Sequence, residues 1–301
     1  MRPRPALTAL VFAALSAIPS AVRAEEAAAD AEASLAAAAI KLHDSLTADQ
    51  RTKAVLPLDD PAREQILFPG GPRAGIPLKE LTADQRALAM KLLTMFTSEA
   101  GAKKAEQVAT QDPGGSYDKY FLAFFGAPGA GKSYAWRIAE HHLTLVQVEV
   151  EQGKPASFGP ILLGSNPPEF WGDEEDAMIA LYAALTPEER KQAGREGKGE
   201  SAKPIEGAGV TVGELCPASR ERVKAVLENR LAFFAPFIRD RVRAMVEKQG
   251  GLSAMRVAFW GEATKRCKDG GFWDFKLGGP AFLCDYENTR KHIHLSMKGK
   301  L

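Results

Sequence analysis

One stretch near the C-terminal end of the sequence combines a strand pattern with chemically active side chains: Asp285-Tyr286-Glu287-Asn288-Thr289-Arg290-Lys291-His292-Ile293-His294-Leu295. An apolar run, Pro280 to Leu283, leads into it and predicts a β-strand. The polar residues 288–291 have the length of a hairpin connection. If Glu287 pairs with His292, Asp285 lies opposite His294. Opposed residues share a face of the sheet, as do residues two apart, so two carboxylates and two imidazoles are expected on one patch.

Such a patch favours a divalent metal ion, because imidazole and carboxylate are both good ligands for zinc, iron or manganese. The alternative is that the HxH pair forms only a polar, partly exposed strand face. A second histidine pair, His141 and His142, favours the metal. Four of the chain's five histidines lie in these two stretches, and only His43 lies elsewhere.

We expect His141 and His142 to continue a strand, where adjacent side chains point to opposite faces. Only one of them can then join His292 and His294, and the other belongs to the core or supports a ligand. Three protein ligands with an open position are the pattern of catalytic zinc. Asp285 or Glu287 is the expected further ligand or general base on metal-bound water. Arg137 is a candidate to hold an anionic substrate group.

A second motif points to different chemistry. Residues 126–133 fit the P-loop pattern GxxxxGK[ST] and follow an apolar strand, 120–125. A working P-loop opens a long helix, however, and here the strand-like segment 143–150 follows soon after Ser133. Upstream, the pattern is helical rather than an alternating strand–helix series. We therefore predict a glycine-rich turn between two strands.

The first residues resemble an export signal. Arg2 and Arg4 precede an apolar stretch from Ala6 to Ile18, and small or apolar residues lead to an expected cleavage after Ala24. A signal peptide over residues 1–24 predicts a periplasmic or secreted protein without membrane association after cleavage. In such a compartment Cys267 and Cys284 could pair; three buried thiols are the alternative.

Composition limits the partners and the fold. The chain has 301 residues, 45% of them hydrophobic, with 39 basic and 38 acidic residues. The balanced charge gives no electrostatic footprint for nucleic acid, so a small-molecule substrate or ligand is expected. An alanine-rich lead-in, helical or a disordered tether, covers 25–40, and a single domain covers 41–301.

Helical and strand patterns alternate irregularly along this domain. Thr47 with Gln50, and Thr82 with Gln85, predict capping boxes at helix starts. Pro236 should break a long helical stretch. We predict an α+β fold in which helices pack on a largely antiparallel sheet. The expected helices are 87–96, 173–185 and 218–249, and the expected strands are 120–125, 143–150, 155–163, 255–260 and 272–277.

Several segments together carry a recognisable pattern: Leu46–Arg51, Pro72–Gly75, Leu81–Ala87, Phe125-Gly126-x-Pro128, Trp136-Arg137 with Glu140–Leu143, Leu163–Pro167, Ala258–Gly261, Gly279–Thr289 and His292–His294. In this order they resemble an exported bacterial family known only as domain of unknown function 3500. The resemblance implies that the P-loop match is accidental, and that Glu140, Asp285, Glu287 and Lys291 replace the family's usual Gly, Glu, Asp and Asn. The resemblance implies no settled reaction. The histidines and carboxylates themselves favour a metal-dependent hydrolase or oxidoreductase; the alternatives are a non-catalytic metal- or ligand-binding protein and, less favoured, a nucleotide-binding protein.

Overall fold

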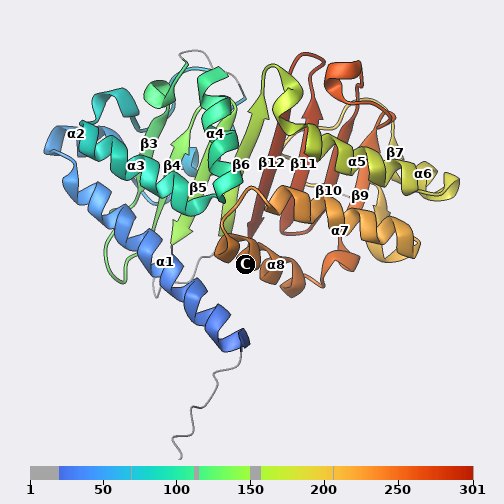
Figure 1. Ribbon diagram of the computed structural model, residues 1–301, viewed down its shortest axis with the longest axis horizontal. Coiled ribbons are helices and arrows are strands. Elements are labelled where there is room, and N and C mark those ends of the chain that lie inside the picture. The colour runs from blue at the N-terminus through green and yellow to red at the C-terminus, as the bar shows by residue number, and fades with distance from the viewer. Residues whose placement is uncertain (1–19, 69, 112–114, 150–156, 206, 301) are drawn as a thin grey trace, which may run out of the picture.

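The computed structural model describes residues 20–68, 70–111, 115–149, 157–205 and 207–300 (Figure 1). Most of the expected signal peptide, residues 1–19, lies outside this range. The alanine-rich lead-in is helical, since it belongs to α1 (Ser20–Ser45). Leu35, Ala39 and Leu42 on this helix are fully buried. In the described part of the chain, no helix has both the length and the apolar character needed to cross a membrane.

The expected α+β fold is confirmed: one mostly antiparallel sheet has helices packed on it. The strand order is β1-β3-β4-β5-β6-β12-β11-β10-β9-β7, with β2 beside β3 and β8 beside β9. Only the β1–β3 and β7–β9 pairings between described strands are parallel. The strands are β1 (Val55–Leu56), β2 (Ile76–Pro77), β3 (Phe121–Phe125), β4 (Tyr134–Ala139), β5 (Leu143–Glu149), β6 (Ser157–Ser165), β7 (Gly194–Arg195), β8 (Val210–Thr211), β9 (Arg256–Trp260), β10 (Asp274–Gly279), β11 (Phe282–Asn288) and β12 (Ile293–Lys300).

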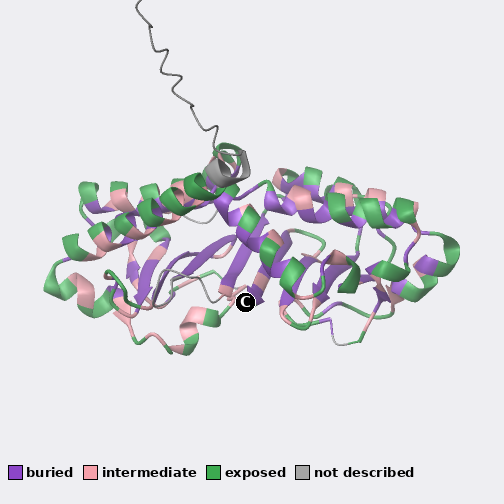
Figure 2. Cartoon of the chain, turned by 90° about the horizontal axis from the view of Figure 1, so that it is seen from below, coloured by how far each residue is buried: buried purple, intermediate pink, exposed green. Residues whose placement is uncertain are grey.

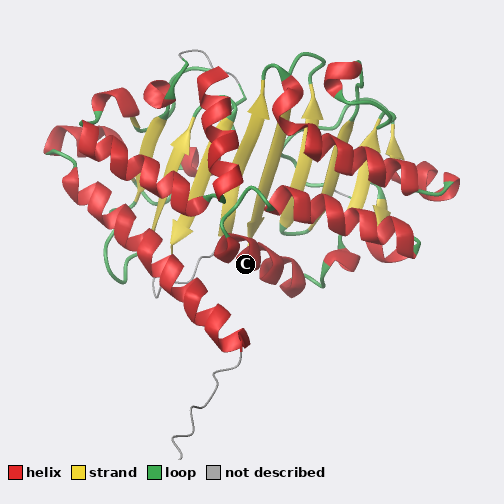
Figure 3. Ribbon diagram, viewed as in Figure 1, coloured by secondary structure: helices red, strands yellow, loops and turns green. Residues whose placement is uncertain are grey.

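The longer helices lie on one face of the sheet, and loops cover much of the other (Figures 2 and 3). Both predicted capping boxes are present, at Thr47 and Thr82. The predicted break at Pro236 separates two helices, because proline is tolerated in a first helical turn but not in a helix interior. The helices are α2 (Ala48–Ala54), α3 (Ala83–Phe96), α4 (Glu99–Gln111), α5 (Gly172–Ala184), α6 (Pro187–Ala193), α7 (Pro217–Leu231) and α8 (Pro236–Lys248).

The two faces of the sheet have different neighbours. On the helix side, aromatic side chains pack in contact with one another, with ring centroids 5.5 Å apart for Phe96 and Trp136 and 5.3 Å apart for Phe158 and Phe234. On the other side, Phe125 belongs to a smaller cluster under Leu56, Leu58 and Ala62. The sheet is therefore buried on both faces around β3, β4 and β5.

The glycine-rich segment 126–133 connects β3 to β4, which pair antiparallel. The predicted turn between two strands is confirmed. Since β4 begins at Tyr134, directly after the motif, no helix places its N-terminal amides at this loop, and the arrangement of a P-loop is absent there. The three cysteines are free thiols, so the expected alternative of a disulfide between Cys267 and Cys284 is not formed.

The C-terminal hairpin is built one residue later than expected. Pro280 and Ala281 form a turn, and β11 begins at Phe282. The connection between β11 and β12 covers 289–292, so Glu287 pairs with His294 and Asp285 with Ser296. The predicted pairing of Glu287 with His292 was wrong because Thr289 closes the turn: its backbone N–H donates to the carbonyl of His292 at 3.0 Å.

Candidate metal site

The two histidine pairs meet because of the position of β6 in the sheet. Leu163 of β6 pairs with Leu143, the first residue of β5, and also with Leu295 of β12. The β4–β5 turn and the β11–β12 turn therefore lie at the same end of the sheet, on either side of β6 (Figure 1). His141 and His142 lie in the first turn, and His292 and His294 lie in and beside the second.

All four imidazoles converge at this point. One potential ligand atom of each lies within 4.8 Å of those of the other three. Both His141 and His142 lie at the cluster, so the expectation that a strand would point one of them away from it was wrong. These residues form the turn after β4 ends at Ala139, so the alternation of side chains along a strand does not separate them. His142 and His294 are buried, and His141 and His292 are half-buried.

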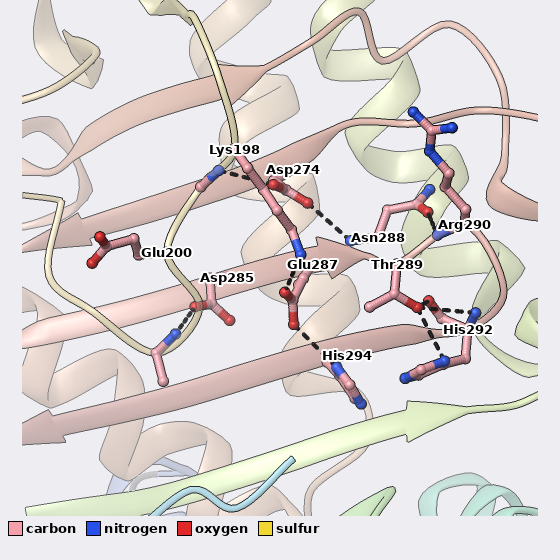
Figure 4. Close-up of polar contacts among 12 residues, drawn as sticks. Lys198, Glu200, Asp274, Asp285, Glu287, Asn288, Thr289, Arg290, His292 and His294 are labelled. Atoms are coloured by element: carbon pink, nitrogen blue, oxygen red, sulfur yellow. Dashed lines mark hydrogen bonds and ion pairs between the residues drawn. The ribbon is translucent and has the colours of Figure 1, made fainter. Parts of the chain in front are cut away.

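Glu287 fixes the orientation of His294. Its Oε2 lies 3.1 Å from Nδ1 of His294, and its Oε1 lies 2.7 Å from Nζ of Lys198 (Figure 4). Burial raises the pKa of Glu287, but the hydrogen bonds with His294 and Lys198 outweigh it and lower the pKa to about 2. Because an ionised carboxylate only accepts hydrogen bonds, Nδ1 of His294 carries the proton. In the neutral ring, the lone pair is then on Nε2, which has no hydrogen-bond partner among the described residues.

Thr289 orients His292 in the same way (Figure 4). The Thr289 hydroxyl donates to the carbonyl of His292 at 2.7 Å, so its single proton is used. Its oxygen, 3.0 Å from Nδ1 of His292, must therefore accept there. This leaves the lone pair of the neutral ring on Nε2. Burial, and then the neighbouring imidazoles, lower the pKa of His292 to about 4, so the ring is neutral at neutral pH.

Gly164 gives the imidazoles room on β6. A Cβ atom at this position would lie 2.6 Å from the carbonyl oxygen of Ile293, 2.9 Å from Cδ2 of His142 and 3.1 Å from Cδ2 of His294. Such contacts are too short for a relaxed side chain, so only glycine lets both rings lie against the strand. Phe68, from a loop far away in the sequence, packs on His294 with ring centroids 4.9 Å apart. The rings of His142 and His294 thus lie against β6, which we call the floor of the site, and Phe68 from the loop packs on His294.

The site lies within the part of the chain that matches a sequence family. The profile of a family described as "Protein of unknown function (DUF3500)" matches residues 28–298. The chain belongs to the DUF3500 family. Both histidine pairs and Glu287 lie within the matched residues. No curated protein and no solved structure matches the chain.

Two other candidate residues of this DUF3500 protein have partners away from the imidazoles. Asp285 is buried, and accepts hydrogen bonds from the backbone N–H of Ser296 at 3.0 Å and from that of Ala202 at 2.6 Å (Figure 4). Burial raises the pKa of Asp285. Arg137 is also buried and donates to the carbonyls of Ala62 and Ala74. Its burial and the nearby charge of Arg73 lower the pKa of Arg137 to about 10. Both side chains hold loops against the sheet.

Sequence reasoning missed four residues that shape the site of the DUF3500 chain. Thr289 and Gly164 lie within motifs that carry the family resemblance, and their presence there was the available signal. Phe68 and Lys198 lie on loops, and nothing in the local pattern connects them with the histidines. Their contribution follows only from the tertiary fold.

Proposed function

We propose that this protein is a metal-dependent enzyme, a hydrolase or an oxidoreductase, with its centre at His141, His142, His292 and His294. The observation that carries the proposal is the convergence of four imidazoles from two separate turns. Histidines that serve only the fold have no reason to gather in this way. Holding four rings that become cationic on protonation this close together, two of them buried, is unfavourable without a ligand.

The surroundings of the rings support the same conclusion. Metal-ligating histidines usually donate their second ring N–H to a carboxylate or another oxygen, which fixes the tautomer. Glu287 accepts this hydrogen bond from His294, and the hydroxyl oxygen of Thr289 accepts it from His292. Imidazole donors suit zinc and iron better than manganese, which prefers oxygen ligands. We therefore place zinc or iron ahead of manganese.

An enzyme needs a coordination position that substrate or water can reach. His141 and His292 are only half-buried, which favours access from their side of the cluster. Glu287 is tied to His294 and Lys198, so its role in this proposal is to orient and charge-balance a ligand. The export signal expected over residues 1–24 supports a periplasmic or secreted location for this activity, and the proposed substrate is a small molecule.

Metal analysis of protein purified without an affinity tag tests the proposal. We expect about one zinc or iron per chain in the wild type, and loss of nearly all of it in a His292→Ala, His294→Ala double variant. His43→Ala is the matched control, since His43 is the one histidine outside the cluster. Metal content that is unchanged in the double variant would reject the proposal.

A second candidate function is non-catalytic binding of a metal or small ligand in the same compartment. The observation that favours it is that all four imidazoles are close enough to close a four-coordinate shell, as in structural zinc sites. Turnover of the metal-loaded protein on a broad panel of ester, amide, phosphoester and oxidisable substrates separates the two. Activity lost in the double variant and kept in His43→Ala supports the enzyme.

A further inference from the structure

The four imidazoles are not equivalent in their spacing. The ring centroids of His141 and His142 are 3.8 Å apart. Each of these two rings lies farther from the HxH rings: His141 is 5.5 Å from both His292 and His294, and His142 is 5.4 and 5.7 Å from them. His292 and His294 are separated by 4.7 Å. One pair is thus much tighter than the other five.

A metal ion makes a definite demand on these spacings. Imidazoles bound through nitrogens about 2.1 Å from one tetrahedral ion have ring centroids roughly 5 Å apart. Five of the six separations are close to that value. The short distance between His141 and His142 means that His292, His294 and one member of the adjacent pair can share an ion without rearrangement. The fourth ring would have to move.

Burial distinguishes the two members of the adjacent pair. His142 is buried, at 3% exposure, and lies against Gly164 beside His294. His141 is half-buried and lies toward the loop at Gly70, which would place a Cβ atom 3.9 Å from the Cβ of His141. The carboxylate of Glu140 accepts from the backbone N–H of His141 and from that of Gly71. His142 is thus fixed in the interior, while His141 stands at the boundary with a loop.

We propose that His142, His292 and His294 form a three-imidazole core, and that His141 stands at an exchangeable fourth position. An oxygen-donor group of the substrate, such as a carboxylate or a phosphate oxygen, takes that position from the side of Gly70. The proposal rests on the proposed function, because it assigns the roles of the same four rings.

Single alanine variants of the four histidines, tested by metal titration, separate these roles. Alanine at His142, His292 or His294 should weaken zinc binding about 100-fold or more, and alanine at His141 should weaken it by less than about 10-fold. His141→Gln, which keeps side-chain volume, should behave like His141→Ala. His43→Ala is the control, and far-UV circular dichroism checks that each variant is folded.

Azide binding to cobalt-substituted protein tests the exchangeable position, with the visible absorption of cobalt as the readout. We expect azide to change the spectrum of the wild type, and to bind at least about 10-fold more tightly to His141→Ala, because no imidazole has to be displaced. Zinc loss in His141→Ala equal to that in His142→Ala, or an unchanged azide affinity, would overturn the proposal while leaving the metal site in place. Unchanged zinc binding in all four variants would instead reject the proposed function.

Discussion

Two groups of polar side chains lie on the same face of the C-terminal strands, and they are used differently. Under the loop 198–203, Asp274 accepts from the backbone N–H of Gly199, and Lys276 donates to the carbonyl of Lys203. Asp285 accepts from Ser296 and Ala202 in the same region. These side chains satisfy the backbone of a loop. Further along the same face, one ligand atom of His292 and one of His294 lie within 4.8 Å of those of the other two imidazoles.

The first group makes hydrogen bonds that stabilise the fold, whereas the second group includes a ring nitrogen that is available to a ligand. A buried polar group left without a hydrogen bond costs about 1–3 kcal/mol. Nε2 of His294 has no hydrogen-bond partner within the described residues, so it lowers the free energy of unfolding by an amount of this order. Asp285 is buried just as deeply and is well bonded. The histidine cluster thus lowers the stability of the metal-free protein, whereas the side chains under the loop 198–203 raise it. A local loss of stability of this kind is expected of a site that binds a ligand.

The largest effect should come from removing the loop anchor. Asp285→Ala should lower the free energy of unfolding by about 3 kcal/mol, since it leaves the buried N–H of Ser296 and the half-buried N–H of Ala202 unpaired. In metal-free protein, His294→Ala should cost less than about 1 kcal/mol, because it also removes an unpaired buried nitrogen. Urea unfolding of both variants measures the contrast. Equal losses would break the distinction between the two groups.

Gly164→Ala should disturb both the metal site and the pairing of β6 with β12, because its Cβ would also lie 2.6 Å from the carbonyl oxygen of Ile293. The added Cβ pushes His142 and His294 away from β6, and we expect zinc affinity to fall about 30-fold, or about 2 kcal/mol. Gly70→Ala is the matched control: its Cβ would meet its nearest neighbours, in His141 and Glu140, only at 3.9–4.0 Å. Zinc titration by calorimetry measures both. An affinity in Gly164→Ala like that of the control would contradict the role of β6 as a floor.

Glu287→Gln should weaken zinc binding less than Gly164→Ala does. The amide removes the negative charge that holds the proton on Nδ1 of His294, and we expect zinc affinity to fall about 10-fold. Glu200→Gln serves as the control, since Glu200 is an exposed carboxylate on the neighbouring loop that pairs with Lys203. A variant that binds zinc as tightly as the control would show that Glu287 does not support the ligand.

The smallest expected effect is at a carboxylate far from both groups. Burial raises the pKa of Glu189, but the N–H groups of Cys216 and Thr186 and the hydroxyl of Ser219 outweigh it and lower the pKa below 4.5. A lowered folded-state pKa contributes stability that is present above pH 4.5 and is lost as the pH falls below it. Glu189→Gln should cost about 1 kcal/mol at pH 7.

The cost of Glu189→Gln should shrink toward pH 3, because protonation removes the same charge from the wild type. Thermal unfolding across this range measures it. A cost that stays constant or grows on acidification would contradict the assigned pKa shift.

Local sequence signals predicted most elements but not the geometry of the site. The caps at Thr47 and Thr82 and the break at Pro236 depend on neighbouring residues, so they were readable. The C-terminal turn lies one residue later than expected, which shifts the pairing by two residues, because the bonding of Thr289 with His292, rather than polarity, sets the turn. The histidine pair at 141–142 was placed on a strand, since nothing in its own segment shows that β4 has ended. The partner of Asp285, Ala202, comes from a distant loop.

X-ray diffraction at the zinc absorption edge, from crystals of zinc-loaded protein, tests the central claim most directly. We predict one anomalous peak between the two turns, about 2.1 Å from Nε2 of His292 and Nε2 of His294. The absence of a peak there at saturating zinc, or a peak bound only by surface residues elsewhere, would contradict the metal site.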